Sequence, residues 1–81
     1  NCLVADGCNI VGTVKDSIIS RNVVIEEGAV VKNSIVMQGT VVKKGADIEY
    51  CIIDKDVVIS QGWTLVGAQT APVILQKGTR I

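Results

Sequence analysis

The chain has 81 residues, with 8 Lys or Arg, 8 Asp or Glu and no His, so its formal net charge is zero. It is 48% hydrophobic but only 2% aromatic, and Val and Ile, whose β-branched side chains favour strands, dominate. A nucleic-acid-binding protein usually has a basic patch and aromatic stacking platforms, and a membrane span needs roughly 20 apolar residues in a run. We therefore expect one small β domain, residues 1–81, with no nucleic-acid or membrane partner.

The cysteines also bear on where the protein works. Cys2, Cys8 and Cys51 are odd in number and lack the CxxC spacing of metal ligands. Free cysteines are commonly buried, and the cytoplasm keeps thiols reduced. No signal-peptide pattern opens the chain. These features predict buried thiols in a cytoplasmic protein, and Asn1 in place of Met favours a fragment of a longer chain.

In chain order, the first clear pattern is a repeat of 17 residues that begins near Val14. Within each repeat, aliphatic residues recur every five or six positions and act as anchors. Residues i and i−2 of a strand share a face, so the residue two positions before each anchor should point inward with it. The anchors are Ile19, Ile25, Val31, Val36, Val42, Ile48, Ile53, Ile59 and Leu65. Their inward companions are Ser17, Val23, Ala29, Ser34, Thr40, Ala46, Cys51, Val57 and Trp63.

Residues that tolerate a positive φ stand at regular places between the anchors. At the six-residue steps the turn positions are Asn22, Gly28, Gly39, Gly45, Asp56 and Gly62. The five-residue steps turn through Asp16, Asn33 and Tyr50 instead. An amphipathic helix would not place the same residue types at equivalent positions of successive repeats. A hairpin meander would need longer strands with alternating polar faces. The pattern predicts an all-β fold, a single-stranded parallel β-helix of hexapeptide repeats with about four to five coils.

The two ends of the chain follow the pattern less closely. Two earlier inward pairs are predicted at 2–4 and 8–10, but the next pair, at 12–14, follows after only four residues. That short step is either a tight corner or part of one longer strand. Near the C-terminus, 73–75 is predicted to be a final strand and 77–79 a closing turn. We expect Trp63 to cover the open end of the prism, with ligand stacking as the alternative.

The residue between two inward ones points outward. On the first face these residues are Ile18, Ile35 and Ile52; on the second they are Val24, Val41 and Val58; on the third they are Val30, Asp47 and Thr64. Monomeric proteins rarely expose large contiguous apolar patches. We therefore interpret the first two faces as docking surfaces for another domain or subunit. The alternative is that Val and Ile stand there only because they suit strands.

No catalytic constellation is visible in the sequence. Without His, the chain has neither the general base of hexapeptide acyltransferases nor the ligands of a His-rich zinc site. Ser17 and Ser34 are inward small residues with no base beside them, and no Gly-rich phosphate loop is present. We predict no catalytic, cofactor-binding or metal-binding residue in these 81 residues.

The repeat segments resemble the C-terminal β-helix of glucose-1-phosphate adenylyltransferase (ADP-glucose pyrophosphorylase). The resemblance covers nearly the whole chain. Segments 37–42 and 72–78 look most like the regulatory-type subunit of glycogen biosynthesis. The segments that carry the resemblance are 7–10, 12–19, 31–37, 37–42, 52–57 and 72–78.

This resemblance implies a left-handed helix, against the usual right-handed crossover of parallel strands. It also implies a nucleotidyltransferase domain that precedes these residues and carries the ATP, glucose 1-phosphate and Mg²⁺ sites. In the family the β-helix packs on that domain, joins homo- or hetero-oligomeric subunits and takes part in allosteric regulation. No catalytic residue of the family maps onto this chain, so the enzyme activity would belong to the parent protein or complex.

Two alternatives stay open. The chain could be the same appendage on another sugar nucleotidyltransferase, such as a relative of mannose-1-phosphate guanylyltransferase. It could also be a fragment of a hexapeptide acyltransferase whose His lies elsewhere.

Overall fold

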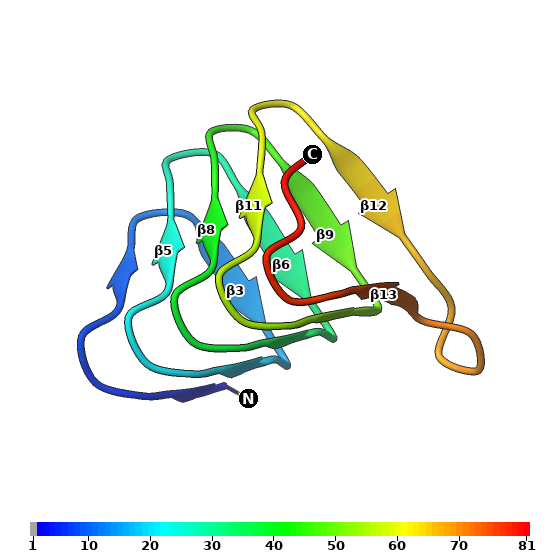
Figure 1. The fold of residues 1–81 in the computed structure, drawn as a ribbon, viewed down its shortest axis with the longest axis horizontal. Coiled ribbons are helices and arrows are strands. Elements are labelled where there is room, and N and C mark those ends of the chain that lie inside the picture. The colour runs from blue at the N-terminus through cyan, green and yellow to red at the C-terminus, as the bar shows by residue number, and fades with distance from the viewer. Residues whose placement is uncertain (1) are drawn as a thin grey trace.

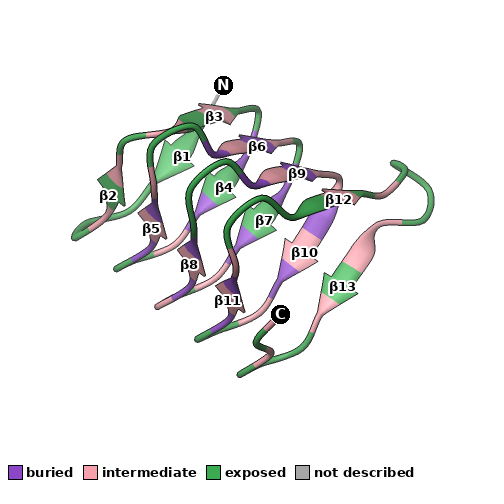
Figure 2. Ribbon diagram, turned by 90° about the horizontal axis from the view of Figure 1, so that it is seen from above, coloured by how far each residue is buried: buried purple, intermediate pink, exposed green. Residues whose placement is uncertain are grey.

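The computed structural model describes residues 2–81, which form a left-handed parallel β-helix of about four turns (Figures 1 and 2). Three parallel sheets make the sides of a triangular prism, and the chain visits them in the same order in every coil. The predicted fold class is confirmed. No helix in the described residues has the length and apolarity needed to cross a membrane.

The thirteen strands are two or three residues long, and each sheet takes one strand from each coil. Sheet A consists of β1 (Leu3–Val4), β4 (Ile18–Ile19), β7 (Ile35–Val36), β10 (Cys51–Ile53) and β13 (Val73–Leu75). Sheet B consists of β2 (Asn9–Ile10), β5 (Val24–Ile25), β8 (Val41–Val42) and β11 (Val58–Ile59). Sheet C consists of β3 (Thr13–Lys15), β6 (Val30–Lys32), β9 (Asp47–Glu49) and β12 (Thr64–Val66).

The strand register agrees with the repeat read from the sequence. In the middle of sheet A, Ile18 pairs with Ile35 and Ile35 with Ile52, a shift of 17 residues at each strand. Every described residue that is buried is one of the predicted inward positions, and of the nine anchors and nine companions only Leu65 and Trp63 are not buried. The pairs predicted at 2–4, 8–10 and 12–14 are not buried either. Each buried aliphatic side chain contributes on the order of 1.5–3 kcal/mol to folding. The core is therefore a stack of identical columns (Figure 2).

The turns between strands lie where the sequence predicted them. All nine predicted turn residues have a positive φ, from 47° at Asp16 to 79° at Gly62. Glycine, asparagine and aspartate adopt this left-handed conformation at little cost. Tyr50, with a φ of 53°, is the bulky exception.

The short step near the N-terminus is a tight corner and not a longer strand. Val11 and Gly12 both donate backbone hydrogen bonds to the Ile25 carbonyl, at 2.9 and 3.2 Å. A Cβ at Gly12 would lie 2.4 Å from the Ala29 carbonyl oxygen and 2.7 Å from that of Glu26. Only glycine fits so close to two backbone carbonyls, which is how this coil turns with fewer residues than the others.

The C-terminal end adds a fifth strand to sheet A. After β12, the chain makes a small loop with an antiparallel bridge between Ala68 and Ala71, and then adds β13 to sheet A. The predicted final strand and closing turn are both present, the turn with Gly78 at a φ of 77°. Trp63 precedes β12, the outermost strand of sheet C, and its side chain is 44% exposed. Its role as a cover for the open end stays a prediction.

Candidate docking surface

The inward polar residues form a ladder that uses their hydrogen-bonding groups within the core. Ser17 Oγ donates to the Lys15 carbonyl at 2.7 Å and accepts from the Ser34 backbone N–H at 3.1 Å. One coil later, Ser34 Oγ donates to the Lys32 carbonyl at 2.7 Å and accepts from the Cys51 N–H at 3.1 Å. Both serines are 3% exposed. Their hydroxyls are thus structural, in agreement with the interpretation of these residues as small inward positions.

Cys51 ends this ladder, and its thiol is held in the neutral form. Burial raises the pKa of the Cys51 thiol, although a hydrogen bond to the Glu49 carbonyl works in the opposite direction. A thiol with a raised pKa is a poor nucleophile near neutral pH. Of the other cysteines, Cys8 is partly buried but Cys2 is exposed, so the prediction of buried thiols is wrong for Cys2. Cys2 belongs to the first coil, where the core is still incomplete.

The described residues contain no group of three or more His, Cys, Asp or Glu side chains that could hold a metal ion. Every buried side-chain nitrogen or oxygen atom among residues 2–81 has a hydrogen-bond partner. The interior therefore offers no orphaned polar group that points to a ligand.

Sheet A carries a straight row of large aliphatic side chains on its outer face. The row crosses all five strands in register and consists of Leu3, Ile18, Ile35, Ile52 and Ile74. The exposed fraction is 70% at Leu3, 46% at Ile18, 37% at Ile35 and 65% at Ile74, while Ile52 is half-buried. We call this row the sheet A ridge. The three residues predicted for the first face all belong to it.

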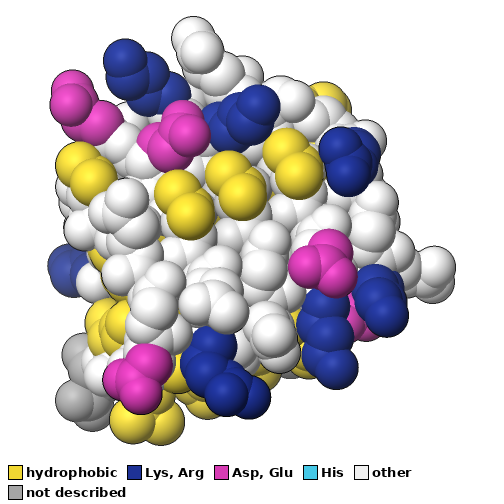
Figure 3. All heavy atoms as spheres, turned by 60° about the vertical axis from the view of Figure 1, so that its left-hand side comes forward, with side chains coloured by type: hydrophobic (Ala, Val, Ile, Leu, Met, Phe, Trp, Pro, Cys, Tyr) yellow, Lys and Arg dark blue, Asp and Glu magenta, His cyan; other side chains and the backbone are white. Residues whose placement is uncertain are grey.

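The row predicted for sheet B points outward as well, but it is better covered. Val24, Val41 and Val58 lie in register on β5, β8 and β11, and all three are half-buried. Figure 3 shows hydrophobic side chains in a line across this face, between bands of charged side chains at the corners. Valine is shorter than isoleucine, so a larger share of its surface is covered by the strands beside it. The two predicted faces are therefore not equivalent.

Sheet C presents a polar outer face, as expected. Thr13, Val30, Asp47 and Thr64 form its central row. Beside them, Lys15, Lys32, Glu49 and the exposed Val66 line up in a second row. A mixed row of this kind suits contact with water, which leaves sheet A as the strongest apolar surface of the molecule.

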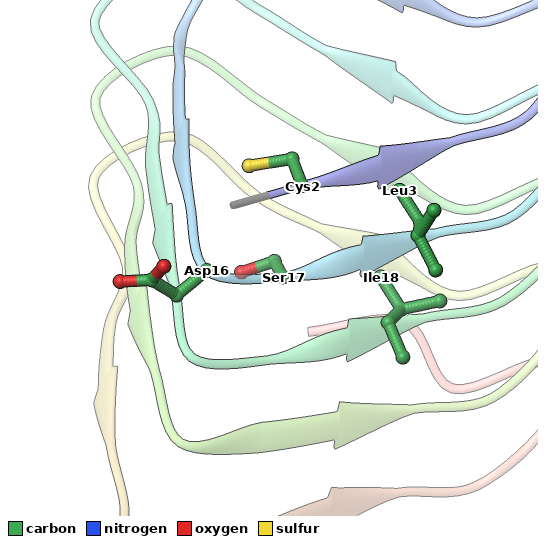
Figure 4. Close-up of a pocket in the computed structure, with 5 residues that line it drawn as sticks. All are labelled: Cys2, Leu3, Asp16, Ser17 and Ile18. Carbon is green, nitrogen blue, oxygen red and sulfur yellow. The ribbon is translucent and has the colours of Figure 1, made fainter.

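Two shallow grooves run along the sheet A ridge, one on each side. The first groove lies toward the corner formed by Asp16, Asn33 and Tyr50, and the loop that holds Gln69 and Pro72 also lines it. It continues over the end of the sheet, where Leu3 and Ile18 project from neighbouring strands and Asp16 stands at the corner (Figure 4).

The second groove lies on the other side of the ridge, where Met37 and two cations, Arg21 and Lys55, line it. Ile35 borders both grooves and so separates them.

The sequence identified the middle of this surface but missed its extent. Leu3 and Ile74 stand between inward residues in the same way as Ile18, and that signal was available in the segments 2–4 and 73–75. Nothing in the sequence predicted the grooves, because they are formed by corner residues that only the fold places beside the ridge. That these residues form a docking surface stays a prediction.

Comparison with known proteins places the repeat in a family. Residues 1–77 match the model of a family described as GlmU-like, C-terminal hexapeptide. Searches of curated proteins and of solved structures found no match.

Proposed function

Because the chain belongs to the GlmU-like C-terminal hexapeptide family, we propose that it is the assembly and regulatory domain of a sugar-phosphate nucleotidyltransferase. The parent enzyme would be glucose-1-phosphate adenylyltransferase of glycogen biosynthesis, which forms ADP-glucose and diphosphate from ATP and glucose 1-phosphate. The resemblance of segments 37–42 and 72–78 supports the regulatory-type subunit.

The observation that carries this proposal is the sheet A ridge. A polypeptide that carries five aliphatic side chains in one straight row, four of them exposed, has a surface suited to contact with protein. A role in assembly uses this outer surface, whereas the inward polar residues are already engaged in the ladder that starts at Ser17. The second row, through Val41, would contribute to the same assembly.

We assign no residue of this chain to ATP or Mg²⁺. These ligands would bind in the nucleotidyltransferase domain that the resemblance implies. The proposal places the protein in the cytoplasm, where the free thiols of Cys2, Cys8 and Cys51 would stay reduced.

The test is to express the full-length protein with candidate catalytic subunits, to purify the complex and to measure ADP-glucose synthesis with and without it. We expect co-purification and a change in the rate of synthesis or in its response to effectors. Ile35→Lys should weaken the complex, because it places a charge in the middle of the ridge. Thr64→Lys, on the polar face of sheet C, is the matched control.

Each alternative has its own outcome. Synthesis of GDP-mannose in place of ADP-glucose would assign the chain to another sugar nucleotidyltransferase. Protection of the full-length protein from unfolding by acyl-CoA would assign it to an acyltransferase. Either result would overturn the proposal.

A further inference from the structure

We propose that the outer edge of β12 accepts an extended segment of a different polypeptide, which adds to sheet C as a fifth strand. Sheet A ends with β13, and sheet B is extended by a bridge between Arg80 and Val58, but β12 is the outermost strand of sheet C (Figure 1). The last coil of the described residues therefore covers only two sides of the prism. This site is separate from the sheet A ridge, so the inference does not depend on the proposed function.

The backbone of β12 has unused hydrogen-bonding groups along its outer edge. The Asp47 N–H donates to the Trp63 carbonyl at 2.7 Å, which is one of the bonds that join β9 to β12. Alternate residues of a strand direct their N–H and C=O groups to opposite sides, so those of Thr64 and Val66 are directed toward the open end. On that side they make no backbone hydrogen bond to any described residue. Two donors and two acceptors are thus in position to pair with one parallel strand, as in β-strand addition.

The inward side chains of this coil indicate which segment fits. Trp63 stands in the column of Ala29 and Ala46, which are 0% and 1% exposed, yet Trp63 is 44% exposed because no strand lies over β12. The residue placed over Trp63 has to be small, since tryptophan fills much more volume than the alanines of that column. Leu65 is only half-buried and favours an aliphatic residue over it. The segment therefore carries a small residue and, two positions later, Val, Ile or Leu, as do the three sheet C strands below β12.

The C-terminal end of the prism is stepped, and the step over β12 is one strand high, about 4.8 Å. A second copy of this chain, stacked with its N-terminal end here and sheet A over sheet A, does not fill the step, because its first coil has one strand in each sheet and none to spare. A copy rotated by a third of a turn would fill it, but would present the same step at its own far end and so build an open chain of molecules. One extended segment fills the step and ends the sheet.

Trp63 fluorescence measures the binding, because Trp63 is the only tryptophan of the 81 residues. The probe is a peptide, capped at both ends, with the sequence EEGAVVKN of residues 26–33, which contains a sheet C strand with its alanine and valine two positions apart. Titration should move the Trp63 emission to shorter wavelength as the ring is covered. Half-saturation is expected at roughly 0.1–1 mM, since so short a strand buries far less area than a stable interface. An emission spectrum that stays unchanged at saturating peptide would overturn the proposal.

Methylation of single peptide nitrogens tests the strand pairing. Within the protein, the Val30 N–H donates to the Ala46 carbonyl of the following coil at 2.8 Å, so the first valine of the bound peptide would direct its N–H away from β12. The second valine would direct its N–H to the Thr64 carbonyl. N-methylation of the second valine should therefore weaken binding roughly fivefold or more, as expected for one lost hydrogen bond, and N-methylation of the first should leave it unchanged. Equal effects of the two methyl groups would overturn the proposal.

A variant pair of the protein tests the same edge from the other side. Val66→Pro removes an outer N–H of β12 that makes no bond to β9, a position where an edge strand tolerates proline, and Val66→Thr keeps that N–H as the matched control. Val66→Pro should weaken peptide binding by a factor similar to that of the methylated second valine, with its circular dichroism spectrum unchanged. Sedimentation of the protein without peptide completes the test. A mass that grows steadily with concentration, and that Val66→Pro alone reduces, would assign the edge to rotated copies of this chain and would overturn the proposal.

Discussion

The coils in the middle of the prism and the coils at its ends share one sequence pattern but differ in burial. All thirteen fully buried apolar side chains of the described residues lie between Ile19 and Ile59. The equivalent inward residues at the ends pack against this core but are only partly buried: Cys8, Ile10, Val14, Leu65, Val73, Leu75 and Ile81. The difference arises because an inward side chain is covered by the coils on both sides of it, and an end coil has a neighbour on one side only.

This comparison shows that the stability of each coil comes mainly from its neighbours. In a protein where each repeat contacts only the next, the free energy is close to a sum of nearest-neighbour terms. The same substitution should therefore cost much more in the middle than at an end.

Ile48→Ala, in the central coil, should give the largest loss of stability. The side chain is fully buried, so its removal loses transfer free energy and leaves a cavity, together about 2–5 kcal/mol. Ile10→Ala, at the partly buried N-terminal end, should cost about 1 kcal/mol. Urea unfolding followed by circular dichroism measures both. Equal losses would mean that burial by neighbours does not set the stability of a coil.

Ser34→Ala should interrupt the hydrogen-bond ladder in the middle of the prism. The change leaves the buried Cys51 N–H without its partner, at a cost of about 1–3 kcal/mol, whereas the Lys32 carbonyl keeps the hydrogen bond that it accepts from the Tyr50 N–H at 3.1 Å. Thr79→Ala removes a comparable bond to the Gln76 carbonyl in the exposed closing turn and should cost about 0.5 kcal/mol or less, because water can replace that bond.

Thermal unfolding of both variants would show the contrast. If Ser34→Ala is neutral, the ladder contributes little to the stability of the core.

Tyr50→Asn should stabilise the protein by about 0.5–1 kcal/mol, because asparagine adopts a positive φ more readily than tyrosine. The reverse change, Asn33→Tyr, occupies the same corner one coil earlier and should destabilise it by a similar amount. Denaturant midpoints of the two variants give the comparison. Destabilisation by Tyr50→Asn would show that ring contacts in the first groove outweigh the backbone strain.

The smallest effect concerns alkaline pH. Burial raises the pKa of the Cys51 thiol above its ordinary value of 9.0, so the unfolded chain loses this proton at a lower pH than the folded one. The contribution of this thiol to stability is therefore constant below pH 9.0 and is lost as pH rises toward its folded pKa. As the pH rises above 9.0, wild type should lose stability faster than Cys51→Ser, which lacks the group. Parallel curves for the two proteins would contradict this.

Much of the fold was predictable because the same pattern of inward and turn residues recurs in each 17-residue repeat. Ser17, Ser34 and Cys51 occupy equivalent positions in three successive repeats. Because all three are small, the sequence identifies this position as inward, which one of these residues alone would not do. The corner at Gly12 was not predictable, since it depends on two carbonyl oxygens of the next coil. The sequence also did not show that Ile35 is more exposed than Val41, because it predicts only that both are outward aliphatic residues.

The sequence by itself determined which residues face inward, where the chain turns and how many residues make a coil. These properties follow from local side-chain alternation and from the φ that each turn residue tolerates. Only the tertiary structure decided how far each of the five residues of the ridge is exposed and that grooves flank it. The surface is assembled from five strands that meet by stacking, so its shape and exposure exist only once the coils lie on one another.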